Sequence, residues 1–227
     1  MFWVRCNPVS AESLTGLYAL RGKCYTPCRG LGNNLAPAGE VLEDSPVRVL
    51  HLGKIRHARV WIEELPDAAY PAIKVLTHTI AAGAASRNIL RLAAIEVFVP
   101  LGPRWMYGLL GGQFSQDSTG QLIVDVGVST PNGRSFPDSL AMKGEEVRVG
   151  LPAEYAQSVL AGVDLAETEL KTLAPGKLSI SCATHGTIGS SQAIYKHLSA
   201  TLVKFFNTAS LESSDDELAK LFPGTFS

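Results

Sequence analysis

The stretch from Cys182 to Ser191 places a thiol, an imidazole and two serine hydroxyls where an expected strand passes into an expected helix. Cys182 or Ser190 beside His185 would form a nucleophile and general base, so one interpretation is a small hydrolase-type enzyme. Helix N-termini also present unpaired N–H groups that suit an anion, which makes His185, Gly186, Ser190 and Ser191 candidates for a binding loop. The structural interpretation is that serine caps the helix and that the cysteine is buried on its strand.

Three cysteines near the N-terminus, Cys6, Cys24 and Cys28, are candidate zinc ligands together with His51 or His57. A structural zinc site needs four ligands, usually in two closely spaced pairs. Only Cys24 and Cys28 lie close together in the sequence. The spacing therefore favours free thiols, and we expect no metal and no cofactor.

The composition is that of an ordinary globular protein of 227 residues, with 46% hydrophobic and 18% charged residues. The net charge of −1 gives no signal for DNA binding, because proteins that wrap nucleic acid are usually basic. No apolar run approaches the roughly 18 residues that a membrane span needs, and no signal peptide is recognisable. Four cysteines without such a signal indicate reduced thiols and a cytoplasmic protein.

The elements that would position the Cys182–Ser191 stretch follow a regular order in the second half of the chain. Apolar runs predict strands at 121–129 and 177–183, with a short extended segment at 147–149. Proline opens one helix at 152–168, and a stripe of apolar residues four apart defines a second at 190–206. We expect the two helices to pack side by side on one face of a sheet that contains both strands.

The first half of the chain carries a similar pattern. Alternating or continuous apolar runs predict strands at 47–52, 55–62 and 92–99. Between the strands at 55–62 and 92–99, four apolar residues are spaced four, three and four positions apart, which predicts a helix over 69–80. The residues of that stripe are Ala69, Ile73, Leu76 and Ile80.

Together the elements predict an α/β (α+β) fold of two β-α-β units with helices on one face of mixed sheets. The two units are either a duplication or two unrelated units of a common kind. The spacing of Ser214 and Glu217 is that of a capping box and starts a last short helix. The predicted divisions are a turn-rich segment at 1–46, a first unit at 47–107, a second unit at 108–206 and a tail at 207–227.

Short motifs stand in a defined order along the second unit. They are Gly111-Gly112-Gln113-Phe114 before a strand, Leu151-Pro-Ala-Glu-Tyr155 at a helix start, and His185 followed by Ser190-Ser191 and Tyr195-Lys196. In this order the motifs resemble domain IV of translation elongation factor G. That domain is a β-α-β module of the ribosomal protein S5 domain 2-like fold, and the resemblance covers about residues 108–206.

The resemblance implies that Gly112, Gln113 and Phe114 share an exposed tip with the loop that follows His185. It implies a non-enzymatic binding module whose partner is RNA or another protein. The chain contains no Gly-x-x-x-x-Gly-Lys-[Ser/Thr] motif, so such a module would lack the GTPase domain. A hydrolase-type enzyme that uses Cys182, His185 and Ser190 is the alternative, and a homo-oligomeric structural protein is a third interpretation.

Overall fold

The computed structural model of the chain describes residues 45–81, 90–117, 120–141, 144–166 and 175–224. All of them belong to one compact unit, Val41–Ser227. The candidate zinc ligands Cys6, Cys24 and Cys28 lie outside the described residues, as does most of the turn-rich segment at 1–46.

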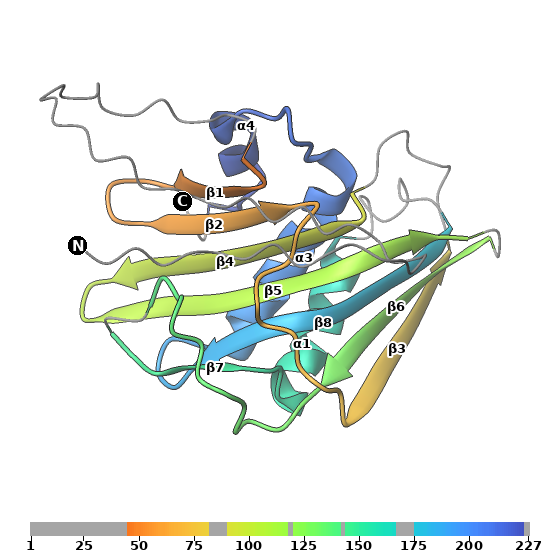
Figure 1. Cartoon of the computed structure of the whole chain (residues 1–227), viewed down its shortest axis with the longest axis horizontal. Coiled ribbons are helices and arrows are strands. Elements are labelled where there is room, and N and C mark those ends of the chain that lie inside the picture. The colour runs from red at the N-terminus through yellow and green to blue at the C-terminus, as the bar shows by residue number, and fades with distance from the viewer. Residues whose placement is uncertain (1–44, 82–89, 118–119, 142–143, 167–174, 225–227) are drawn as a thin grey trace, which may run out of the picture. The chain divides into compact units, whose positions relative to one another are not determined.

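Eight strands form one sheet in the order β1-β2-β4-β5-β8-β6-β3, and β7 pairs with the end of β8 (Figure 1). The pairing is antiparallel between all neighbours except β6 and β8, which run parallel. The strands are β1 (Val47–His51), β2 (His57–Ile62), β3 (Lys74–Ala81), β4 (Leu92–Leu101), β5 (Arg104–Gln116), β6 (Gln121–Val128), β7 (Val147–Val149) and β8 (Gly176–Gly186).

Two long helices, α1 (Ala153–Leu165) and α3 (Gln192–Thr208), lie side by side on one face of this sheet (Figure 1). This arrangement confirms the packing expected for the helices at 152–168 and 190–206. Their backbones meet closely at Gly162, where an added Cβ would lie 2.0 Å from the Lys196 carbonyl oxygen. A third helix, α4 (Asp215–Lys220), begins at the expected capping box of Ser214 and Glu217.

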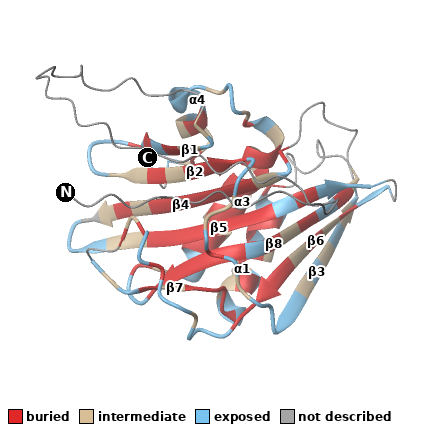
Figure 2. Ribbon diagram, viewed as in Figure 1, coloured by how far each residue is buried: buried red, intermediate tan, exposed pale blue. Residues whose placement is uncertain are grey.

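The alternation of buried and open residues along the strands creates a core on each side of the sheet. Leu122, Val124 and Val126 of β6 point into a large core under α1 and α3. On the opposite face, irregular segments cross β4, β5 and β8 and enclose a small core, while β3 at the sheet edge stays mostly exposed (Figure 2). The buried members of this small core are Trp61, Ala68, Ala94, Tyr107, Leu109, Phe136, Ala141, Val147, Val149 and Cys182.

The helix expected over 69–80 is wrong, because most of that range is strand β3. Val75, Thr77, Thr79 and Ile80 are β-branched, and such side chains fit a pleated surface better than a helix. The strand pairs along its whole length with β6. The first half therefore lacks its expected helix, and the boundary expected between residues 107 and 108 falls inside β5, so the two predicted units share one sheet.

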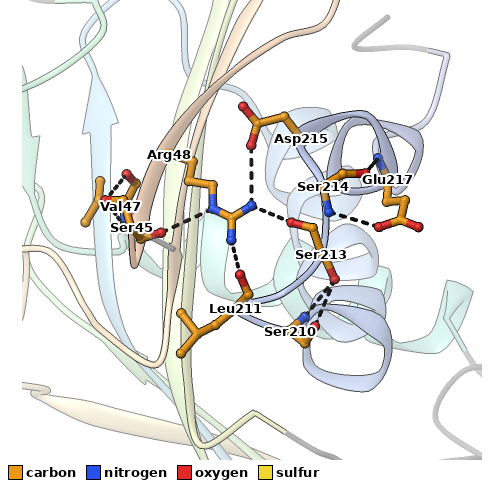
Figure 3. Close-up of polar contacts among 9 residues, drawn as sticks. All are labelled: Ser45, Val47, Arg48, Ser210, Leu211, Ser213, Ser214, Asp215 and Glu217. Carbon is orange, nitrogen blue, oxygen red and sulfur yellow. Dashed lines mark hydrogen bonds and ion pairs between the residues drawn. The ribbon is translucent and has the colours of Figure 1, made fainter. Parts of the chain in front are cut away.

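A buried cation ties the first strand to the end of the chain (Figure 3). The guanidinium of Arg48 donates to the carbonyl oxygens of Ser45 at 3.2 Å, of Leu211 and of Ser213. Asp215 adds a weak ion pair at 3.5 Å. Because the planar fork of arginine can satisfy several acceptors at once, Arg48 fixes the α3–α4 connection against β1.

Candidate functional site

The loop between β8 and α3 already holds an anion, and that anion is the side chain of Glu145. Its carboxylate accepts the N–H groups of Ile188 at 2.6 Å and Gly189 at 3.0 Å, and the indole N–H of Trp105 at 2.6 Å. A Cβ on Gly186 would lie 2.3 Å from the same carboxylate. The expected concentration of N–H donors is present, but the chain itself occupies it.

The hydroxyls of this loop serve the fold. Ser190 Oγ accepts the N–H of Gly186 at 2.8 Å and donates to the Tyr107 carbonyl at 2.9 Å. Ser191 caps α3 by accepting the N–H of Ile194. Ser191 is therefore the helix cap expected in the structural interpretation, whereas Ser190 links the loop to β5.

Cys182 and His185 do not form a nucleophile–base pair. Cys182 points into the small core, and burial raises the pKa of its thiol to about 12, so the nucleophilic thiolate is suppressed. His185 lies three residues further along β8, on the opposite face, where it contacts the ring of Tyr155 on α1. Its ring nitrogens each lie 3.1 Å from a backbone carbonyl, of Gly150 and of Pro131.

The expected exposed tip is wrong in two respects. His185 is only 7% exposed, and Gly112 and Phe114 are buried within β5. Gln113 is exposed, but it pairs with Ser179, whereas the part of β5 nearest His185 is at Leu109. Four residues of strand separate Gln113 from Leu109 by about 13 Å, so Gln113 is not adjacent to His185.

A buried ionic cluster that no sequence motif indicates is centred on Glu96, whose side chain is 0% exposed. Its carboxylate accepts two bonds from Arg59, at 2.7 and 2.9 Å, and one each from the Tyr107 hydroxyl and the Leu140 N–H, both at 3.0 Å. Burial raises the pKa of Glu96, although the guanidinium of Arg59 opposes this shift. The cluster fastens the 130–141 segment to the sheet and is closed to ligands.

An open groove lies where β6 ends and β3 begins, and it was not predicted either. It holds about 340 Å³ and is lined by residues of the segments 69–73 and 129–134 and by Val149 of β7. Its apolar lining includes Ile73, which is 69% exposed, and the ring of Tyr70, whose hydroxyl donates to the Gly127 carbonyl at 2.8 Å. The complete lining is Ala69, Tyr70, Pro71, Ile73, Ser129, Thr130, Asn132, Gly133, Arg134 and Val149.

The rim of this groove is polar. Arg134 donates to the carboxylate and the carbonyl of Asp67, both at 2.6 Å, so its charge is already paired. Gly133 is held so close to β7 that a Cβ would lie 1.7 Å from the Val149 carbonyl oxygen. Asn132 is exposed on the rim, and its amide can both donate and accept a hydrogen bond.

Comparison with known proteins finds no matching protein-family model, no matching curated protein and no matching solved structure. Within the described ranges, no group of three or more His, Cys, Asp or Glu side chains is placed to hold a metal ion. No helix among the described residues has the length and apolar character to cross a membrane. The functional proposal therefore depends on the geometry of the chain itself.

Proposed function

We propose that this chain is a non-enzymatic binding module and that its ligand is an extended segment of another protein, held in the groove beside Tyr70. The observation that carries the proposal is the pairing of an exposed apolar wall with a free amide on the rim. Ile73 and Tyr70 offer contact to an apolar side chain. Asn132 offers a donor and an acceptor, which matches the peptide group of an extended chain.

The charges around the groove favour protein over RNA. A site that tracks a phosphate backbone needs cations that are free to neutralise it. Arg134 on the rim is bound to Asp67, and Lys177 on the neighbouring open sheet face is bound to Asp125 at 2.7 Å. The net charge of −1 adds no general attraction for a polyanion.

The proposed module is built on a fold like that of elongation factor G domain IV. Support comes from the succession β6, β7, α1, β8 and α3, in which the parallel neighbours β6 and β8 are connected through the short β7 and a helix and are followed by a second helix. The ribosomal role of that domain is not part of the proposal, because Gln113 and His185 lie on different parts of the sheet. A fold of this kind leaves function to the site that it carries.

Selection from a library of random-sequence peptides tests the proposal directly. We expect enriched peptides to share an apolar residue. Ala69→Phe, which fills the groove from an exposed position, should weaken their binding at least about tenfold, the value of one buried apolar side chain. Ile55→Ser is the matched control, because Ile55 is 59% exposed and lies on the β1–β2 connection away from the groove.

The readout is the dissociation constant of a fluorescent selected peptide, measured beside a random single-stranded RNA of similar length. Equal weakening by the two variants would contradict the proposed site. Tighter binding of the RNA than of any selected peptide would contradict the proposed ligand class. Thermal unfolding of both variants checks that the groove-filling change leaves the fold intact.

A further inference from the structure

Strand β3 ends the sheet with an unpaired edge. It is last in the strand order, and among the described residues no strand bonds to its outer side. From Val75 to Ala81, exposed residues alternate with half-buried ones, of which Leu76 and Ile80 pack against the large core. Such an edge presents a row of free N–H and C=O groups that can pair with another strand.

The two edges of the sheet differ in their protection. The opposite edge strand, β1, has five residues, follows Pro46 and is fastened through Arg48 to the α3–α4 connection. β3 is longer and contains no proline, and its one lysine, Lys74, stands at its first position. Natural edge strands that must stay unpaired usually carry several such blocking features.

The sequence of β3 is self-complementary about His78. If a second β3 runs antiparallel with His78 opposite its own copy, Leu76 faces Ile80 and Thr77 faces Thr79. One step further out, Val75 faces Ala81. Apolar residues thus oppose apolar residues on the helix side of the sheet, and threonines oppose threonines on the other side, which is a favourable cross-strand combination.

We infer that a second copy of this chain pairs with β3 about a twofold axis through His78 and continues the sheet across two molecules. A twofold interface requires one patch that complements itself, which the symmetry of Leu76 and Ile80 provides. Asp164 of α1 lies 3.0 Å from His78, so each imidazole at the axis has a carboxylate beside it. Leu165, the next residue of α1, is exposed and adds apolar surface on the same element.

Paired charge variants test both the dimer and its register. Val75 is 50% exposed and Ala81 is exposed, so charges at these positions need not disturb the fold. The double variant Val75→Glu/Ala81→Glu places two like-charged pairs across the interface and should raise the dimer dissociation constant about tenfold or more. Val75→Lys/Ala81→Glu places opposite charges at the same positions and should retain the dimer.

Analytical ultracentrifugation across a concentration series measures the dissociation constants, and His78→Cys supplies an independent reading of the axis. Under mild oxidation, His78→Cys should form a disulfide-linked dimer, whereas Thr77→Cys, which does not face its own copy, should link far less. A wild-type chain that stays monomeric at high micromolar concentration overturns the proposal. Equal association of the two charge variants overturns it as well. Peptide binding in the Tyr70 groove is measured separately, so neither outcome bears on the proposed function.

Discussion

Replacing Arg59 with methionine should make the stability of the protein strongly dependent on pH. The change removes both bonds to the Glu96 carboxylate and leaves that group buried with only the Tyr107 hydroxyl and the Leu140 N–H. Removing one partner of a buried ion pair typically costs about 3–5 kcal/mol when the remaining group is charged. Methionine keeps part of the apolar contact that Arg59 makes over the Trp61 ring.

The sign of the pH dependence follows from the pKa of Glu96. Burial already raises this pKa above its ordinary value of 4.5, and loss of Arg59 raises it further. A raised folded-state pKa contributes stability that is present below the unfolded value and is lost as the pH rises through the folded value. The deficit of the variant relative to wild type should therefore be small at about pH 4 and clearly larger at about pH 8.

Urea denaturation of wild type and Arg59→Met at both pH values measures this deficit. Adding Glu96→Gln to Arg59→Met should restore most of the lost stability at high pH, because a neutral amide can still accept from Tyr107 and Leu140. Asp138→Asn is the control for the outer part of the cluster. The Asp138 side chain is 81% exposed, so this change should cost about 0–1 kcal/mol. A deficit that is equal at both pH values, or no rescue by glutamine, would refute this account of the cluster.

Three further outcomes are expected. Glu145→Ala should lower the free energy of unfolding by about 2–3 kcal/mol, because three N–H donors lose a charged acceptor, and should alter Trp105 fluorescence. Glu146, the exposed neighbour of Glu145, is the control: Glu146→Ala should change the free energy of unfolding by no more than about 0.5 kcal/mol. His185→Ala should cost about 1–3 kcal/mol in the same urea assay, since the imidazole is buried between α1 and the Gly150 carbonyl, and that buried carbonyl loses the ring nitrogen beside it. Cys182 should resist a thiol reagent in the native state and react fully in denaturant, measured in a chain with serine at Cys6, Cys24 and Cys28.

Most of the second half could be predicted from the sequence because each element there carries its own strong periodic signal. The apolar stripe of α3 predicts a helix, and the apolar run of β6 predicts a strand. Each pattern also indicates which face of its element is buried, independently of the rest of the chain. The capping box at Ser214 is equally local. Packing of α1 and α3 on one face follows, since both helices have to cover the same apolar sheet.

Strand β3 could not be predicted from apolar spacing alone. Ile73, Leu76 and Ile80 satisfy a helical repeat, yet Leu76 and Ile80 are also an even number of residues apart and so lie on one face of a strand. The β-branched residues within the segment favour a strand, but the edge of β6 with which the strand pairs lies about 50 residues away in the sequence. Pairing with β6 outweighed the helical spacing.

The candidate site, too, depends on contacts between segments that are remote in sequence. A concentration of N–H donors after β8 was predictable from glycine and serine at a helix start, but its occupant, Glu145, is remote in sequence. The Tyr70 groove depends on two irregular segments, 69–73 and 129–134, which meet only after the sheet has formed. Neither segment carries a motif that indicates the other.

The interior position of β8 has a consequence for how the chain is made. β8 lies between β5 and β6, yet it is the last strand in the sequence. It ends about 60 residues after β6, which at about 5–20 residues per second delays it by about 3–12 s during synthesis. During that interval β1, β2, β4 and β5 can already pair with one another. The edges of β5 and β6 that β8 will later join stay unpaired in the nascent chain.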